Sequence, residues 1–228
     1  MTLVFTRYLY EKSLVQSSLV SSLLDKQREE ALFWAYELYH SGFQQETWDL
    51  VEHIYSTYYE KTNPRVKRRL SEFSEIWRST GNPAILGTAV GTLAARSTEG
   101  QERLIVLNYR LHRHDTVPMT GPARKYLAEV CLWPIRISQS ETSLYGETSL
   151  YGETSLYKDA YLGENWLYYC AGSPIWLDRI RAFRGRVSDK DQSVAFDSDE
   201  DLEAFYDEWG LEPDEQSIEM HRVHGVHL

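Results

Sequence analysis

The chain has 228 residues and a formal net charge of −10 at pH 7; 42% of its residues are hydrophobic and 25% are charged. This composition excludes an intrinsically disordered chain and predicts a packed globular protein. No apolar run reaches about 18 residues and the N-terminus lacks the order of a signal peptide, so we expect neither a transmembrane helix nor a secretory leader. Cys131 and Cys170 lie in apolar contexts, which indicates buried thiols in a reducing compartment.

The negative charge is concentrated near the C-terminus. Residues 191–220 contain 12 Asp and Glu and no Lys or Arg, so removing −12 from −10 leaves about +2 for the rest. The sequence therefore combines a near-neutral body with an acidic C-terminal region. This balance does not favour general attraction to nucleic acid, although a local basic patch can still attract phosphates.

Three helices are predicted first along the chain. Apolar residues at helical spacing indicate one over residues 5–24. Asp25 is a suitable N-cap for a second helix, whose wide apolar arc predicts a central position and which Gly42 is expected to end. The third is predicted over residues 45–60, with one face formed by Trp48, Val51, Tyr55 and Tyr58.

Two further helices open with the same dipeptide. Asn63 and Asn82 are suitable N-caps, and each precedes a proline at the first helical position. The short connections predict antiparallel neighbours, and Gly87 and Gly91 would allow another backbone to approach closely. The apolar stripes are Val66, Leu70, Phe73 and Trp77 in the first helix and Leu86, Val90 and Leu93 in the second.

The second half of the chain has a weaker pattern. Residues 103–109 fit either a strand or a buried helix, and residues 123–133 have a helical pattern. Residues 164–183 predict a helix, a turn and a second helix that opens at Ser173 and Pro174. The last predicted helix follows Ser198 as its cap and carries acids in its first turn, where they complement the helix dipole.

A hexapeptide, ETSLYG, occurs three times over residues 141–158, with Lys158 replacing the last glycine. A period of six gives no single apolar stripe on a helix, and three copies are too few for a stable solenoid. We therefore interpret this stretch as a tolerated insertion between helical portions.

Together these patterns predict an all-α protein, a single domain of antiparallel amphipathic helices arranged as a bundle or a short helical superhelix. Its expected parts are a helical portion over 1–140, the repeat insertion over 141–158, a second helical portion over 159–211 and a tail over 212–228.

Two candidate contact surfaces lie next to each other. The basic one is expected to contact nucleic acid or an acidic segment, either of a partner or of the chain's own C-terminal tail. The alternative is a solvated helix face paired with acidic neighbours. The aromatic one is expected to contact protein, or to stack on single-stranded bases. The basic residues are Lys61, Arg65, Lys67, Arg68 and Arg69, and the aromatic residues are Tyr55, Tyr58 and Tyr59.

Catalytic patterns are weak. Residues 197–208 resemble a calcium loop but have Leu202 where the sharp turn needs glycine. The sequence contains neither a nucleophile motif nor a glycine-rich phosphate loop. We therefore predict no catalytic residue, no metal ligand and no cofactor, and a metal-dependent enzyme is the least favoured alternative. Its candidate ligands would be His112, His114, His221, His224 and His227.

Four stretches have a distinctive wording: residues 7–43, which begin RYLYEKSLVQ, the TNPR at 62–65, WLYYCAGSPIWLDRI at 166–180 and EAFYDEWGLEPDEQSIE at 203–219. They are similar to uncharacterised proteins of large DNA viruses of eukaryotes, of the mimivirus and phycodnavirus kind. The hexapeptide repeat is not part of this pattern. The resemblance implies expression in an infected cell and assigns no activity and no functional residue.

The function expected from the sequence is that of a viral, non-enzymatic helical interaction or scaffold protein. The alternative is a nucleic-acid-associated factor in viral replication or transcription that uses the basic helix around 61–69. We expect a viral or host protein as partner, no membrane, and a location inside the infected host cell or in the virus particle.

Overall fold

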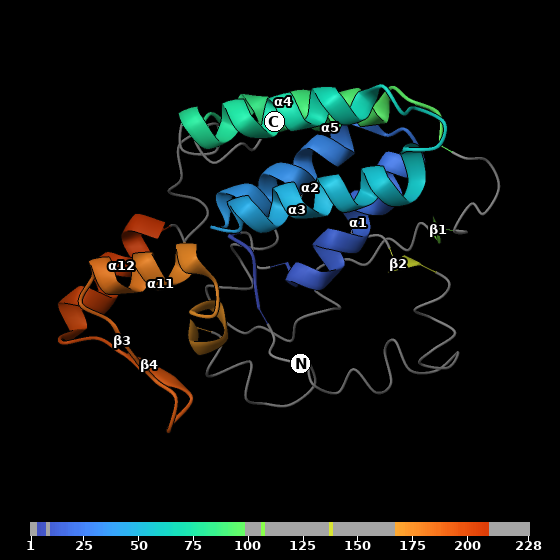
Figure 1. Ribbon diagram of the computed structural model, residues 1–228. Helices are drawn as coiled ribbons and strands as arrows, with labels where there is room; N and C mark the ends of the chain where they lie inside the picture. Colours follow the sequence, from blue (N-terminus) through green and yellow to red (C-terminus); the bar gives the residue numbers. More distant parts are fainter. Residues whose placement is uncertain (1–3, 8–9, 99–105, 108–136, 139–166, 210–228) are drawn as a thin grey trace. The chain divides into compact units, whose positions relative to one another are not determined.

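The computed structural model describes residues 4–7, 10–98, 106–107, 137–138 and 167–209 (Figure 1). They are mostly helical, which confirms the all-α class. They form two compact units. The large unit holds residues 13–98, 106–107 and 137–138, and the small unit holds residues 4–7, 10–12 and 167–209. The first residues of the chain therefore belong to the same unit as the C-terminal helices.

The large unit is a helical bundle in which α4 and α5 lie side by side over α2 and α3 (Figure 1). A pair of two-residue strands, β1 (Val106–Leu107) and β2 (Ile137–Ser138), is antiparallel. The α-helices are α1 (Lys12–Leu24), α2 (Arg28–His40), α3 (Gln44–Ile54), α4 (Val66–Thr80) and α5 (Pro83–Ala94), and a π-helical turn, Tyr55–Tyr59, follows α3.

The predicted start of the first helix was wrong. Phe5 pairs with Glu11 in an isolated antiparallel bridge, and α1 begins only at Lys12. Thr6 Oγ1 accepts a hydrogen bond from the Tyr10 backbone at 3.1 Å, so a side chain satisfies a group that a helix would otherwise bond. The sequence before Thr6 is rich in residues that favour extended backbone.

The predicted cap of the second helix was also wrong. Asp25 and the two residues after it close the C-terminal end of α1, where Gln27 N donates to Ser22 O at 2.8 Å around the left-handed Lys26. The helix α2 therefore starts at Arg28 without a side-chain cap. Its central position is confirmed, because it is buried over a wide arc and packs against α3 and α5. Gly42 follows it with a φ of 96°, as predicted.

The predicted third helix ends in a π-helical turn. Glu60 N donates to Tyr55 O at 2.9 Å, a bond that spans five residues. The extra residue in this turn rotates the chain that follows. As a result, Tyr59 takes the buried position that regular spacing assigned to Tyr58.

The helices α4 and α5 are antiparallel, since they pack along each other and are joined by two residues. Asn82 caps α5 as predicted, accepting from Ala84 N at 2.9 Å. Asn63 does not cap α4. Its side-chain amide donates to Ser97 O at 2.7 Å, which ties the connection before α4 to the end of α5.

Gly87 of α5 was predicted to allow another backbone to approach closely. A Cβ built on Gly87 would lie 2.2 Å from Tyr36 Oη, so this glycine makes room for a side chain of α2 and not for a backbone.

An aromatic network joins three helices of the large unit. Trp77 Nε1 donates to Tyr39 Oη at 2.9 Å, and Tyr39 Oη donates to Gly81 O at 3.0 Å. The rings of Trp48 and Trp77 lie 5.4 Å apart. Most of the aromatic content of this unit is therefore structural, because these rings are more than nine-tenths buried.

Replacement of Ser74 by alanine is expected to raise the free energy of unfolding by about 0.5–1 kcal/mol. Ser74 is 1% exposed on α4, and its hydroxyl has no hydrogen-bond partner among the described residues. Alanine removes a buried polar atom and favours the helix. Urea denaturation measures the effect, with Ser79→Ala on the exposed side of α4 as the control. A loss of stability in the Ser74 variant alone would contradict this account.

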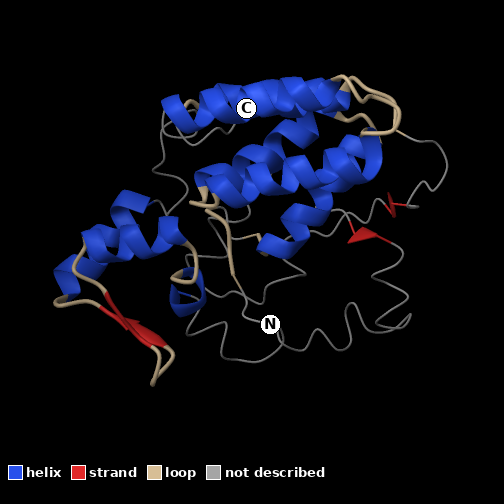
Figure 2. Cartoon of the chain, in the orientation of Figure 1, coloured by secondary structure: helices blue, strands red, loops and turns tan. Residues whose placement is uncertain are grey.

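The small unit contains α11 (Pro174–Ala182), α12 (Asp199–Trp209) and a hairpin of β3 (Arg186–Ser188) and β4 (Ser193–Ala195), shown in Figure 2. The helical residues 167–170 and the turn before α11 confirm the predicted helix, turn and helix, and Ser173 and Ser198 are the predicted caps. The hairpin was not predicted, because strands of three residues are too short to show an alternating pattern.

The calcium-loop alternative does not fit this unit. Residues 199–209 are helical, and the Asp201 carboxylate accepts from the Arg184 guanidinium and, at 3.0 Å, from Ser198 Oγ. The hexapeptide repeat, the predicted helix over 123–133 and the tail lie outside the described residues.

Candidate functional site at the start of helix α4

The five predicted basic residues gather at the N-terminal end of α4. Their side chains are all exposed, whereas Val66 and Leu70 of the same helix are buried against the bundle. Lys61 and Arg65 lie in the connection before the helix, and the other three lie in its first four residues. The prediction of an exposed basic helix face is therefore confirmed.

The cations differ in their partners. Lys67 Nζ lies 2.6 Å from Glu60 Oε1, and this carboxylate raises the pKa of Lys67. Arg68 Nε lies 3.2 Å from Glu72 Oε1, one helical turn away. Both pairs are exposed, so solvent screens them strongly. Within the part of the chain that the structure describes, Arg65 and Arg69 contact no carboxylate.

These cations lie where the helix dipole disfavours them. The N-terminal end of a helix carries a partial positive charge, which acidic residues in the first turn normally offset. The helices α2, α3 and α12 follow this rule. The helices α1, α4, α5 and α11 have no acid in the first turn, and α4 has Lys67, Arg68 and Arg69 there instead. The start of α4 therefore combines exposed guanidinium groups with the positive end of the helix.

The outer face of α4 is defined here as Arg65, Arg68, Arg69, Glu72 and Ile76, which lie at helical spacing opposite the buried stripe. Ile76 is 45% exposed, a high value for a large apolar side chain. This residue was not singled out from the sequence, although its position between Phe73 and Trp77, off the apolar stripe, is a readable signal.

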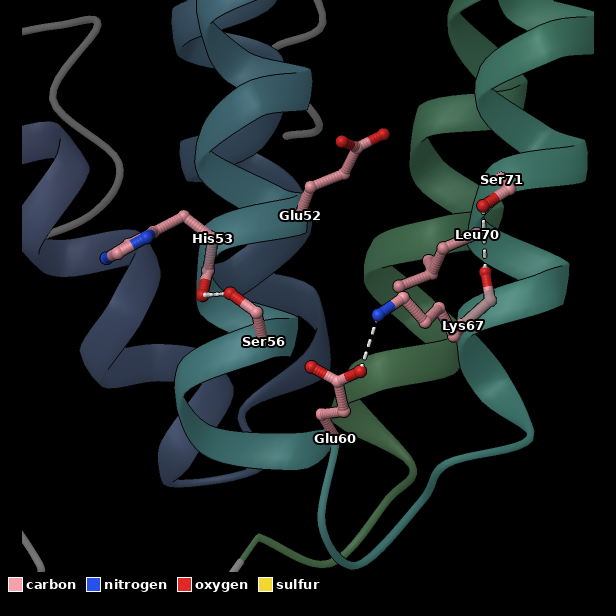
Figure 3. Close-up of a pocket in the computed structure, with 7 residues that line it drawn as sticks. All are labelled: Glu52, His53, Ser56, Glu60, Lys67, Leu70 and Ser71. Carbon is pink, nitrogen blue, oxygen red and sulfur yellow. Dashed lines mark hydrogen bonds and ion pairs between the residues drawn. The ribbon is translucent and has the colours of Figure 1, made fainter.

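A groove of about 300 Å³ lies between the end of α3, the π-helical turn and α4 (Figure 3). Its volume is at the lower end of the range for small-molecule sites. It is lined by Glu52, His53, Ser56, Glu60, Lys67, Leu70 and Ser71.

The polar groups of this groove are not arranged for nucleophilic catalysis. Ser56 Oγ donates to the His53 backbone carbonyl at 2.9 Å, and Ser71 Oγ donates to the Lys67 carbonyl at 3.2 Å. Each hydroxyl is therefore bonded to its own helix, and the His53 ring points away from the Lys67–Glu60 pair (Figure 3). A serine nucleophile would need a base within hydrogen-bond reach.

The predicted aromatic residues are mostly enclosed. Tyr55 is 4% and Tyr59 0% exposed. The Tyr55 hydroxyl donates to Asn63 O at 3.1 Å and the Tyr59 hydroxyl to Leu23 O at 3.0 Å. Tyr58, which is half-buried, is the member of this group that a partner could reach. The π-helical turn decides this distribution, and regular helical spacing could not predict it.

The remaining candidates are inert or lie elsewhere. Cys170 is fully buried, and burial raises the pKa of its thiol despite the opposing charge of Arg179, so the reactive thiolate is disfavoured. Within the described ranges, no group of three His, Cys, Asp or Glu side chains is placed to hold a metal ion. The five histidines considered as metal ligands and Cys131 lie outside these ranges.

Comparison with known proteins gives no relative: no protein-family model, no curated protein and no solved structure matches this chain. Among the described helices, none is long and apolar enough to span a bilayer.

Proposed function

We propose that this chain is a non-enzymatic helical interaction or scaffold protein that binds an acidic protein partner through the outer face of α4. The observation that carries the proposal is the pair Arg65 and Arg69, which lie exposed at the positive end of a helix without a carboxylate among the described residues. A charge arrangement that opposes local stability is expected where function requires it.

The chemistry of this face suits a protein surface. Arginine presents a planar set of donors that matches a carboxylate, and it is enriched at protein interfaces. Ile76 adds an exposed apolar side chain beside the cations. An interface generally combines such an apolar contact with a polar rim.

A nucleic-acid-associated factor is the second candidate, because the same guanidinium groups could bind phosphates. It would gain from the stacking surface that the sequence predicted. That surface is reduced to Tyr58, since the rings of Tyr55 and Tyr59 are enclosed. Ile76 also contributes nothing to phosphate binding. These two points favour a protein partner.

On the basis of the sequence resemblance to proteins of large DNA viruses, we further propose that this function is carried out in an infected cell, with a viral or host protein as the partner. A metal-dependent enzyme is the third candidate. It rests on histidines outside the described residues, and the groove beside α4 offers it no activated nucleophile.

Affinity capture from infected-cell extract tests the proposal. The triple variant R65A/R68A/R69A is compared with R78A/R96A/R181A, which removes the same charge from exposed arginines elsewhere. We expect a specific, identified partner to be retained by the wild type and the control and to fall at least tenfold with the first variant. An unchanged set of partners would refute the proposed surface.

The same proteins are titrated against a single-stranded oligonucleotide by fluorescence anisotropy. If phosphates are the ligand, the log of the binding constant falls with log salt with a slope of about −2 for three contacts, and the first variant removes binding. That result would favour the nucleic-acid candidate over the protein partner.

A further inference from the structure

Helix α12 of the small unit carries the opposite charge to the start of α4. Asp199, Glu200, Glu203, Asp207 and Glu208 are exposed on it, while Asp201 and Phe205 face the core. Among the described residues, Glu203, Asp207 and Glu208 form no ion pair. The exposed side of α12 is therefore a continuous row of carboxylates, interrupted only by Ala204.

The acids at the C-terminal end of α12 interact unfavourably with the dipole of their own helix. The C-terminal end of a helix carries a partial negative charge, which basic residues in the last turn normally offset. The last turn of α12 contains no basic residue and holds Asp207 and Glu208. The end of α12 and the start of α4 are thus both locally unfavourable, with opposite signs.

The two surfaces also agree in spacing. Arg65 and Arg69 are four residues apart, as are Glu203 and Asp207. Four residues rise about 6 Å along a helix, so the two rows present their charges at the same interval. Contact between them would offset both unfavourable helix ends at once.

We propose that the acidic side of α12 in one molecule docks on the outer face of α4 in a second copy of this chain. The proposal rests on the proposed function, because it names the partner of the same surface. A nucleic acid or a foreign acidic protein would satisfy the start of α4 alone and would leave the acidic end of α12 unexplained. The two surfaces differ, so the contact is head-to-tail and builds chains or rings of molecules, as a scaffold requires.

Sedimentation velocity of the full chain tests this contact over about 10–500 µM, the range expected for a small, mainly electrostatic contact. The weight-average mass is expected to rise with concentration at low salt. It should return towards the monomer at about 0.5 M NaCl, where the Debye length is only a few ångströms. A monomeric mass at every concentration and low salt would overturn the proposal.

Charge-swap variants identify the surfaces. R65E/R69E places acids on both sides of the contact, and E203K/D207K places bases on both sides. Each variant alone is expected to associate at least tenfold more weakly. An equimolar mixture should associate again, because each α4 then meets an α12 of opposite charge. R78E/R96E, reversed elsewhere, should behave as the wild type.

The outcomes separate the two proposals. If the single variants still associate, or if the mixture does not, the α4–α12 contact is refuted even where the wild type self-associates. Partner capture that depends on Arg65, Arg68 and Arg69 in a strictly monomeric protein would uphold the proposed function and refute the second copy as partner. Circular dichroism of each variant confirms that its helices are intact.

Discussion

Replacing Trp176 by alanine is expected to lower the free energy of unfolding of the small unit by about 3–5 kcal/mol. This side chain is 0% exposed and packs its ring 6.4 Å from that of Phe205. Its Nε1 donates to Thr6 O at 3.0 Å, so it joins the first residues of the chain to the C-terminal helices. The Arg179 guanidinium lies 4.7 Å from its ring centroid. Truncation creates a cavity, removes the donor to Thr6 O and removes this cation–π contact at once.

Native-state hydrogen exchange measures this loss separately in the two units. We expect faster exchange at the amides of α11 and α12 and unchanged exchange at those of α4 and α5. Val187→Ala is the control, since that side chain is 36% exposed and its truncation leaves no cavity. Equal effects of the two substitutions, or a Trp176 effect below about 1 kcal/mol, would show that Trp176 does not hold the unit together.

The large unit is expected to lose about 2 kcal/mol of stability between pH 10 and pH 12 through Tyr59 alone. Burial raises the pKa of Tyr59 to about 12 from its ordinary value of 10.0. The unfolded chain therefore releases this proton near pH 10 while the folded chain still holds it. The stabilising effect is complete below pH 10 and is lost as the pH rises through 12.

Comparison with Tyr59→Phe isolates this effect from that of other tyrosines, such as Tyr55, whose pKa burial also raises. Near pH 7 the phenylalanine variant should be about 1 kcal/mol less stable, because the bond to Leu23 O is lost. By pH 12 it should be the more stable protein, so the two curves of urea stability against pH should cross. Tyr58→Phe, at the half-buried neighbour, should give no crossing. Parallel curves for the wild type and Tyr59→Phe would contradict the raised pKa.

The stripes of α4 and α5 were predicted from the sequence because a helix repeats every 3.6 residues and its buried side must be apolar. Leu70, Trp77, Leu86, Val90 and Leu93 all occupy their expected buried positions. Phe73 is the exception: it is half-buried, and Ser74 takes the interior position beside it. A buried serine breaks the apolar pattern, so spacing alone could not assign it.

The helix ends were less predictable than the helices. Asn63 and Asn82 occur in the same dipeptide, yet Asn82 alone caps a helix. The Asn63 side-chain amide instead donates a hydrogen bond to Ser97 O, which lies 34 residues further along the chain. The Asn-Pro dipeptide shows that the side chain is able to cap a helix. Whether it does so depends on competing hydrogen-bond partners elsewhere in the chain, here Ser97 O.

The candidate site shows the same division. Helical spacing predicted that three arginines face away from the buried stripe: Arg65, Arg68 and Arg69. The acidic region after residue 190 was also evident from the sequence. Which cations pair with acids depended on side-chain distances: Glu60 pairs with Lys67 and Glu72 pairs with Arg68, whereas no carboxylate of the described residues contacts Arg65 or Arg69. Ion pairs on an exposed surface contribute little to the free energy of folding. They therefore produce no sequence pattern from which the pairing could be predicted.

Helical spacing in the sequence was enough to predict the helical class and most of the buried apolar residues, because hydrophobic burial at this spacing is a local, repeated pattern. The sequence also determined the charge of the α4 and α12 surfaces. Three results required the folded chain: the burial of Tyr59 and not Tyr58, the packing of the first residues with the C-terminal helices, and the ion pairs of the basic residues with acids among the described residues. These results depend on one π-helical turn and on contacts between residues far apart in the chain. Such contacts are individually weak and do not repeat at a regular spacing, so they cannot be predicted from periodicity in the sequence.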